Sequence, residues 1–400
     1  MFKSKGKIKK FAIFFKLRPM NICIVAPYFT PLVRGNEYGL AETLSKLGNN
    51  VTVITSTCKA PREKELTSET ISRDYPFEVI YLRTLADVLE NPIVFADFKK
   101  IIKKFDVVML QEDYPLICHY AFFAAKTYDI ITILSSERTY VPFNLWKRIG
   151  LKLFDSTINK LLREGCDVLT AHCTSAKRFL TDVLGVRRNI EVIPVGVDCK
   201  LFRPIKNPEN LIEFGNEDLR ILTVARYHKY KGLEYLIMAM SHVVREINAK
   251  LYLLGKGEEE LRLKKLANDL NISKYVKFVN VSIPNENMPH VYSSCDIYVQ
   301  PSIIEPYGIA VLEAMACGKP VIGTNVGGML DTIEHGKTGF RTEPANPGGL
   351  TRYIVQLSDN KLRKRMGKNA RRRAELFDWI KIARRYVKLV KNDGVSLVKH

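Results

Sequence analysis

The chain has 400 residues, of which 46% are apolar, and a formal net charge of +20. This length predicts two globular domains, each large enough to bury its own core. No stretch approaches the roughly 18 to 20 apolar residues that span a bilayer, which argues against an integral membrane protein. Eight Cys without a Cys-x-x-Cys pair predict a reduced, cytoplasmic chain and argue against a zinc site.

Positive charge on this scale predicts an anionic partner: nucleic acid, a membrane surface or a phosphorylated substrate. Residues 1–19 form a basic leader that mixes lysines with Ile8, Phe11, Phe14 and Phe15. That composition is typical of a helix lying on the inner, anionic face of a membrane. Two alternatives stay open: a disordered leader with the natural start at Met20, and a signal peptide, for which the apolar run is short.

From Asn21 the pattern alternates between strand and helix, which predicts a parallel, doubly wound α/β sheet. Strands are expected at 22–26, 51–55, 79–82, 107–110, 130–134, 168–171 and 190–195. Helices are expected at 37–47, 117–127, 145–163 and 174–184. A polar stretch, 58–75, interrupts the series. We assign residues 20–198 to a first Rossmann-like domain.

Segment 198–218 carries Pro204, Pro208 and Gly215 without a clear period, which marks a domain boundary. The alternation then restarts, with strands expected at 219–225, 250–254, 276–280, 297–300 and 321–323. Helices are expected at 233–247, 258–270, 287–294 and 309–317. A second Rossmann-like domain, 199–375, follows. A cleft between two such domains is the usual place for a ligand.

The closing segment, 361–391, is the other densely basic part of the chain. Its pattern predicts one continuous helix to about Val390. This helix is either solvated and anchored by Phe377 and Trp379, or in contact with an anionic surface.

One stretch of the second domain combines a strand end with a helix start. Pro306 cannot lie inside a helix and Gly308 suits a close backbone approach, so the helix should begin near 307–309 and end at Gly318. Its amino end leaves the carboxyl edge of strand 297–300. Free N–H groups and the helix dipole favour a phosphate at that place.

Two acids frame this anion site: Glu305 precedes the helix and Glu313 lies on its second turn. A bound phosphate would repel both carboxylates, so we expect each to accept hydrogen bonds from sugar or ribose hydroxyls. The simpler alternatives are a helix cap for Glu305 and an ordinary surface role for Glu313.

Two cations follow the first strand of the second domain. Arg226 leaves that strand, and Lys231 stands beside the start of the next helix. Both can aim into the cleft near Gly308, where two cations and a helix terminus can hold a diphosphate without a metal and stabilise it as a leaving group. The alternative is an exposed basic loop.

These residues resemble the signature of GT-B glycosyltransferases (glycosyl transferases group 1), specifically the retaining family 4 type. The likeness is carried by the run from Arg226 to Gly232, by Glu305-Pro306-Tyr307-Gly308 through Glu313, and by Gly336-Lys337-Thr338-Gly339-Phe340. Further likeness lies in 20–56, in 192–198 and in Phe377-Asp378-Trp379. The resemblance covers about 20–390 and implies the GT-B fold, with an acceptor domain, a donor-nucleotide domain and a final helix, 376–400, that crosses back to the first domain.

The resemblance also implies roles for individual residues. Glu305, Arg226 and Lys231 would be catalytic, with Glu305 touching the transferred sugar and the two cations touching the donor diphosphate. The backbone N–H groups of Tyr307, Gly308 and Ile309 would bind the phosphates, Glu313 the ribose diol, and Gly35 would let a first-domain loop approach the donor. A plain turn is the alternative role of Gly35.

One part of the first domain departs from the family pattern. Family members commonly carry a His after the strand that corresponds to 130–134, and this chain reads Ser135-Ser136-Glu137-Arg138 there. Either Ser135, Glu137 or Arg138 takes over that contact, or the donor or acceptor chemistry differs, or the loop is merely polar. His172 follows another strand and either faces the acceptor or is a buried structural residue.

The expected function is retaining transfer of a sugar from a nucleoside diphosphate sugar to the hydroxyl of an acceptor glycan or lipid, with no metal or cofactor. A lipid-linked acceptor at a membrane surface rests on charge alone. A nucleotide-sugar epimerase of the same fold is the rival enzyme. A basic nucleic-acid-binding protein is the rival of another class, but no recognised module supports it, so we expect no nucleic-acid partner. The sugar, the base, the acceptor and the oligomeric state do not follow from these motifs.

Overall fold

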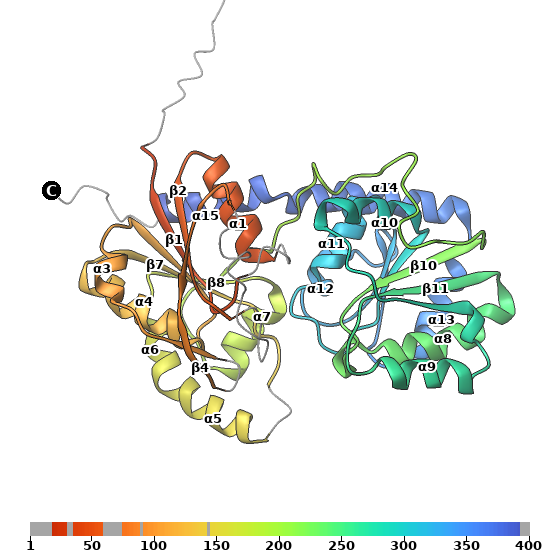
Figure 1. Cartoon of the computed structure of the whole chain (residues 1–400), viewed down its shortest axis with the longest axis horizontal. Helices are drawn as coiled ribbons and strands as arrows, with labels where there is room; N and C mark the ends of the chain where they lie inside the picture. Colours follow the sequence, from red (N-terminus) through yellow and green to blue (C-terminus); the bar gives the residue numbers. More distant parts are fainter. Residues whose placement is uncertain (1–17, 30–34, 59–73, 89–90, 142–144, 393–400) are drawn as a thin grey trace, which may run out of the picture.

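The computed structural model describes residues 18–29, 35–58, 74–88, 91–141 and 145–392. They form two α/β lobes that lie side by side, and helices of the last part of the chain run along one edge of both (Figure 1). Most of the predicted leader and of the polar stretch 58–75 lies outside the described residues. Within these ranges no helix combines the length and hydrophobicity needed to cross a membrane.

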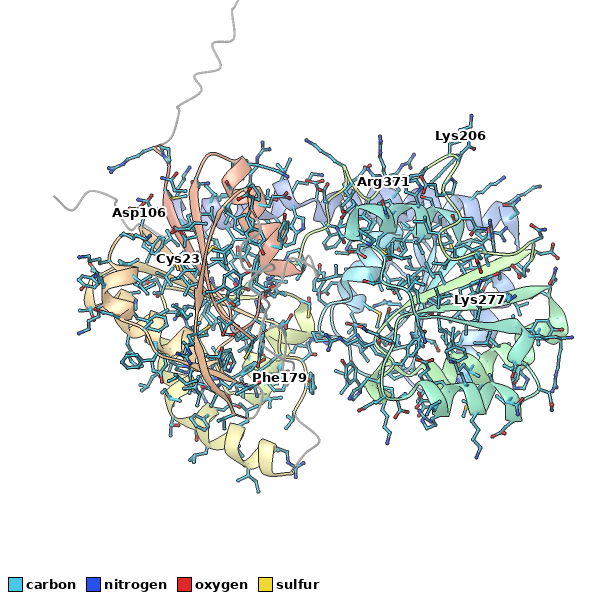
Figure 2. All side chains as sticks on the ribbon, in the orientation of Figure 1. Cys23, Asp106, Phe179, Lys206, Lys277 and Arg371 are labelled. Carbon is cyan, nitrogen blue, oxygen red and sulfur yellow. The ribbon has the colours of Figure 1, made fainter. Side chains whose placement is uncertain are left out.

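The sheet of the first domain has seven parallel strands in the order β3-β2-β1-β6-β7-β8-β9. Their bounds are β1 Asn21–Val25, β2 Asn50–Ser56, β3 Glu78–Leu82, β6 Val107–Gln111, β7 Ile131–Ser136, β8 Val168–Ala171 and β9 Glu191–Val192. The central strands are buried almost continuously, and Cys23 lies inside this core (Figure 2). The strand predicted at 190–195 is wrong in extent, since only two residues pair.

Helices α1 (Asn36–Lys46) and α4 (Leu116–Thr127) agree with prediction, but two other helices of this domain do not. The helix predicted at 145–163 breaks at Thr157 (φ −122°, ψ −101°) into α5 (Leu145–Ser156) and α6 (Ile158–Gly165). The helix predicted at 174–184 is α-helical only in α7 (Thr174–Arg178) and continues as a π-turn, Phe179–Val183. A short helix, α3 (Phe98–Ile102), and an antiparallel hairpin, β4 (Thr84–Asp87) with β5 (Pro92–Val94), were not predicted.

The second domain has six parallel strands in the order β12-β11-β10-β13-β14-β15. Their bounds are β10 Leu219–Val224, β11 Ala249–Leu254, β12 Val276–Val279, β13 Ile297–Gln300, β14 Val321–Thr324 and β15 Gly339–Thr342. Strand β10 pairs directly with β13, so the carboxyl ends of these two strands adjoin. The loop that carries Arg226 and the loop that carries Glu305 therefore start next to each other.

Helices of the second domain are α8 Leu233–Glu246, α9 Glu260–Asp269, α10 Met288–Ser294, α11 Ile309–Ala316, α12 Met329–Thr332 and α13 Pro347–Gln356. The first four match predicted helices. Strand β15 and helices α12 and α13 were not predicted. Two parallel Rossmann-like sheets confirm the predicted fold class.

The closing segment is two helices, not one. Helix α14 (Asn360–Ala374) lies on the second domain and α15 (Trp379–Asn392) on the first (Figure 1). The extended backbone of Asp378 (φ −58°, ψ 134°) separates them, which corrects the prediction of a continuous helix. The Trp379 ring packs so closely on Gly39 and Gly196 that a Cβ at Gly39 would lie 2.2 Å from it.

Part of the basic charge of α14 holds the fold together. The Arg371 guanidinium donates to the carbonyl oxygens of Cys199, Phe202 and Ala316, at 2.7–3.0 Å (Figure 2). It thereby ties the interdomain segment to α11 and α14. Other basic side chains of α14 are exposed, namely Lys361, Lys364, Arg365, Lys368 and Arg372, and their contact with an anionic surface stays a prediction.

Candidate active site

Helix α11 begins at Ile309, inside the predicted range, because Gly308 takes a left-handed conformation (φ 90°, ψ 54°) just before it. Such a backbone favours glycine. Gly327 packs against the same loop, where a Cβ would lie 1.6 Å from the carbonyl oxygen of Glu305. These two glycines let the backbone of 305–308 fold tightly. The first N–H groups of α11, which have no partner within the helix, are thereby presented at the carboxyl edge of the sheet.

Glu305 and Lys231 are in direct contact at this edge. The Lys231 Nζ donates to Glu305 Oε2 at 2.8 Å, and that oxygen also accepts from Ser302 Oγ at 3.0 Å and Gln300 Nε2 at 3.2 Å. The Glu305 side chain is largely buried. The carboxylate is therefore fixed by three donors, and Lys231 keeps one positive charge next to the start of α11.

Arg226 comes two residues after the end of β10 and is exposed. Gly232, with φ 62°, ends the loop, and a Cβ there would lie 2.3 Å from the carbonyl oxygen of Pro301. The loop that bears the two cations thus lies against the loop that follows β13. The structure brings Lys231 into contact with Glu305 and places Arg226 on the same loop, whereas the binding of a diphosphate by the two cations stays a prediction.

Glu313 lies on α11 and accepts a hydrogen bond from Tyr292 Oη at 2.7 Å. Burial raises the pKa of its carboxyl to about 7. A cavity of about 30 Å³ lies between the two domains at this point, and Gly35, Ile309 and Glu313 are among its lining residues. Gly35 of the first domain and Glu313 of the second therefore line one cavity, while their contacts with a donor stay predictions.

A second, larger cavity of about 250 Å³ lies in the first domain, and we call it the cleft cavity. Its lining residues are Pro27, Tyr28, Asn36, Glu37, Gln111, Glu112, Tyr114, Ser135, Glu137 and His172. The Asn36 amide donates to Gln111 Oε1 at 3.1 Å and lies 3.1 Å from His172 Nε2. Asn36, Gln111 and His172 therefore form one buried polar wall.

His172 is neutral in this wall. Burial lowers its pKa to about 4. Its Nδ1 lies 3.1 Å from the carbonyl oxygen of Ile193, which places the proton on Nδ1 and leaves Nε2 to accept from Asn36. His172 is thus both a satisfied buried residue and part of the cavity wall.

Two acids, Glu112 and Glu137, face the cleft cavity. Glu112 directly follows β6 with a left-handed backbone (φ 75°) and accepts from the backbone N–H of Glu137 and, at 3.2 Å, from Ser136 Oγ. Burial, followed by the charges of Asp113 and Glu137, raises the pKa of Glu112 to about 8. Although part of Glu137 is exposed, the protein around the cleft reduces the hydration of its carboxyl, and this effect, followed by the charges of Glu37 and Glu305, raises its pKa to about 7. Glu137 is thus electrostatically linked to Glu305 of the other domain.

Glu112 was not predicted as a site residue, although an acid directly after a buried strand is a usable signal. Glu37, Gln300 and Ser302 were not predicted as site residues either. Among the described residues no group of three His, Cys, Asp or Glu side chains is arranged to hold a metal ion.

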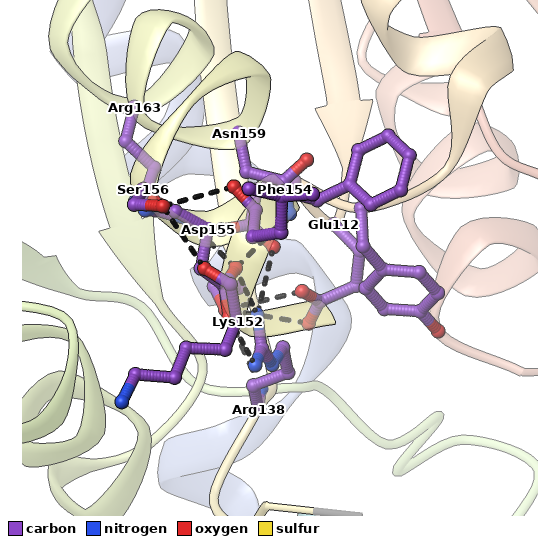
Figure 3. A network of polar contacts seen from close by, with 12 residues as sticks. Glu112, Arg138, Lys152, Phe154, Asp155, Ser156, Asn159 and Arg163 are labelled. Atoms are coloured by element: carbon purple, nitrogen blue, oxygen red, sulfur yellow. Dashed lines mark hydrogen bonds and ion pairs between the residues drawn. The ribbon is translucent and has the colours of Figure 1, made fainter. Parts of the chain in front are cut away.

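Arg138 and Ser135 are committed to contacts within the protein. Arg138 makes two bonds to the Asp155 carboxylate, at 2.8 and 2.9 Å (Figure 3). Its guanidinium also lies over the Phe179 ring. Ser135 Oγ lies 3.2 Å from Tyr386 Oη of α15. Of the three residues proposed to replace the family's His, Glu137 alone is exposed.

The Arg138 contact belongs to a buried ion network. Arg163 pairs with Asp113 and lies 3.3 Å from Asp155, and Asn159 Nδ2 donates to Asp155 at 3.0 Å (Figure 3). Burial would raise the pKa of Asp155, but the bonds from Arg138 outweigh it and hold that pKa below its usual value. This network fixes the end of α5 to the loop after β7.

The two domains touch beside the site. The Thr174 N–H donates to Asp331 Oδ2 at 2.6 Å, and Ser175 Oγ donates to the carbonyl oxygen of Gly327 at 3.2 Å. The start of α7 therefore rests on the loop that packs under Glu305. These two hydrogen bonds hold the cleft-facing sides of the two domains together.

Two family models match the chain in tandem. Residues 38–201 match the model described as Glycosyltransferase Family 4, and residues 207–373 match Glycosyl transferases group 1. The chain is a group 1 glycosyltransferase of the GT-B fold. The two matched regions cover six of the seven strands of the first sheet and all six strands of the second; strand β1 and helix α15 lie outside them.

Similar proteins match either nearly the whole chain or about half of it. An uncharacterized glycosyltransferase of Methanocaldococcus jannaschii is 27% identical over 93% of this chain and 98% of its own length. The N-acetyl-alpha-D-glucosaminyl L-malate synthase of Bacillus anthracis is 30% identical over 54% of this chain and 58% of its own.

Solved structures confirm the fold of the glycosyltransferase. The sucrose-phosphate synthase of Thermosynechococcus elongatus superposes with a TM-score of 0.75 at 22% identity, covering 93% of this chain and 98% of that one. Anabaena HepE, solved in complex with UDP and glucose, gives a TM-score of 0.72 at 18% identity, covering 93% and 99%. At these identities the likeness establishes the GT-B architecture.

Proposed function

We propose that this glycosyltransferase moves a sugar from a nucleoside diphosphate sugar to an acceptor hydroxyl with retention at the anomeric carbon. The observation that carries the proposal is the Lys231–Glu305 contact at the start of α11. A cation beside a helix amino terminus suits a diphosphate, and a fixed carboxylate beside it suits sugar hydroxyls. HepE, of the same fold, is solved with UDP and glucose, which supports this choice of donor.

In the proposed complex, Arg226, Lys231 and the N–H groups of Tyr307, Gly308 and Ile309 hold the diphosphate. Glu313 accepts from the ribose diol, and Glu305 from the transferred sugar. Gly35 of the first domain lines the same small cavity as Ile309 and Glu313 of the second, which supports donor contacts from both domains. We propose that the two cations neutralise the diphosphate without a metal ion or cofactor.

The proposed reaction breaks the bond between the anomeric carbon and the diphosphate oxygen, and the bonding electrons leave with the diphosphate. The acceptor oxygen forms its bond to the same face of that carbon, and its proton passes to an oxygen of the departing diphosphate. Positive charge develops on the sugar ring during this step. The carboxylates of Glu305 and Glu137, on opposite sides of the cleft, are placed to stabilise it.

We further propose that Glu137 replaces the family's His near the sugar. It is exposed to the cleft cavity and interacts electrostatically with Glu305. Ser135 and Arg138 instead serve as supports, because Tyr386 and Asp155 occupy their polar atoms.

The test is a screen of nucleoside diphosphate sugars by thermal shift and by release of nucleoside diphosphate, with and without EDTA. Glu305→Ala and Lys231→Ala should each lower turnover at least a hundredfold. Nuclear magnetic resonance of the product should show the donor's anomeric configuration. Wild-type turnover by either variant would refute the site, an inverted product would refute retention, and acceptor-independent epimerisation would favour the rival enzyme.

A further inference from the structure

The first domain holds another cavity, of about 280 Å³, and among its lining residues Glu137 alone is also proposed to contact the donor. It lies between the β4–β5 hairpin, the start of α4 and helix α5. We call it the apolar cavity, because its walls are formed mainly by Val88, Ile93, Leu116, Leu151 and Phe154. Its size approaches the roughly 300 Å³ of the smallest small-molecule sites.

Large apolar side chains around this cavity face water. The exposed fraction is 50% for Val88, 48% for Phe154 and 44% for Tyr140. Apolar surface gathered around a hollow commonly marks a binding site, since burial in a core would otherwise be favoured. The ion network of Arg138 and Asp155 lies directly behind Phe154 and holds this wall in place.

The apolar cavity is continuous with the reaction cleft. Glu112, Tyr114 and Glu137 line both the apolar cavity and the cleft cavity. Pro306, the neighbour of Glu305 in the second domain, also lines the apolar cavity. A molecule seated there therefore has one end against the hairpin and the other beside Glu305 and Glu137.

We propose that the acceptor is an amphiphile whose aliphatic chain occupies the apolar cavity and whose uncharged, hydroxyl-bearing head lies at Glu112 and Glu137. An aliphatic chain fits because Val88, Phe154 and Tyr140 remain about half exposed around the cavity, so that a chain longer than the cavity can lie against them. The head is uncharged because the acids that meet it, Glu112 and Glu137, cannot neutralise an anion, and the Arg138 guanidinium that also lines the cavity is already paired with Asp155. This inference rests on the proposed function and names the substrate class of the same site.

The test uses n-alkyl β-D-glucosides from methyl to octyl, each below its micelle concentration, titrated calorimetrically onto the full chain. We expect affinity to rise about threefold to fourfold for each added methylene over the first several carbons, the gain for a fully buried CH₂. Octyl phosphate, with the same chain and an anionic head, should bind at least tenfold more weakly than octyl glucoside.

Phe154→Gln and Ile93→Thr, on opposite walls, should each reduce the gain per methylene. The matched control is Leu153→Gln, the next residue on the same helix, which is 65% exposed and lies outside the cavity. It should bind the series like wild type. Melting temperatures of all variants report whether each remains folded.

Affinity that does not depend on chain length, an equal loss in Leu153→Gln and Phe154→Gln, or equal binding of octyl phosphate would overturn the inference. Donor binding is measured separately on the same variants, with the nucleotide sugar that gives a thermal shift or releases nucleoside diphosphate in the donor screen. If no nucleotide sugar binds or reacts, the proposed function is refuted. The dependence of glucoside affinity on chain length tests the role of the apolar cavity independently of that result.

Discussion

Replacing Lys231 by Met removes the ammonium group from Glu305 and keeps a side chain of similar length. Glu305 Oε2 then retains two neutral donors, Ser302 and Gln300, and loses its charged one. A hydrogen bond to a charged group contributes about 1.5–3 kcal/mol, and a buried ion left wholly unpaired costs about 3–5 kcal/mol. Because two donors remain, we expect Lys231→Met to lower the free energy of unfolding by about 2 kcal/mol.

Glu305→Gln removes the other charge and should cost about 1–2 kcal/mol, since Lys231 is less buried and can reach water. The double variant leaves no buried charge unpaired. We therefore expect its loss of stability to be smaller than the sum of the single losses by at least about 1 kcal/mol, the range of coupling between residues in contact. Urea denaturation of the four proteins measures this cycle.

Activity should behave differently from stability across the same four proteins. Each single variant should lose at least about a hundredfold in turnover, and the double variant should recover none of it, because both charges act on the donor. Lys229→Met, an exposed lysine of the same loop, is the control and should retain activity. Additive stabilities would refute the structural pair, and activity recovered with stability would show that the pair only holds the loops together.

Three further changes are measurable. Trp379→Ala should lower the free energy of unfolding by about 3–5 kcal/mol in urea denaturation, and a loss below 1 kcal/mol would contradict the tight packing on Gly39 and Gly196. Affinity for the nucleotide sugar should rise up to about tenfold between pH 6 and 8 as the Glu313 carboxyl ionises. The Glu313→Gln variant should abolish this rise. A wild-type affinity that does not depend on pH would refute the ribose contact. His172 stays neutral in the folded chain and takes up a proton in the unfolded chain, so its contribution to the free energy of unfolding should fall by about 3 kcal/mol as pH drops from 6.5 to 4. The His172→Gln variant should show a weaker dependence of this free energy on pH. An unchanged dependence would refute the neutral, buried state of His172.

The donor half of the site could be predicted because its signals are local. Pro306 and Gly308 limit where α11 can begin. The end of β10 sets where the loop with Lys231 starts, and the end of β13 sets where the loop with Glu305 starts. Direct contact between Lys231 and Glu305 could not be predicted, since 74 residues separate them and only the pairing of β10 with β13 brings their loops together.

The acceptor half resisted prediction because long-range pairing decides which polar side chains are available. Arg138 looks like a free cation in the sequence, yet the structure pairs it with Asp155, which lies just before the break at Thr157. The β4–β5 hairpin was missed because its four- and three-residue strands give too short an alternation to recognise. Similarly, the extended backbone of Asp378 interrupts a helical pattern without any Pro or Gly to mark the break.

The position of α15 has a consequence for how the protein is made. Trp379, Ile382, Ala383, Tyr386 and Val390 are all buried, and α15 packs on α1, which lies more than 330 residues earlier in the chain. During synthesis the surface of α1 that α15 covers therefore stays exposed until the entire second domain has been synthesised. The second domain can fold before α15 has been synthesised, and only its contacts with the first domain form later. We expect nascent chains that stop before residue 379 to recruit chaperones through α1, and chains that include α15 to be released.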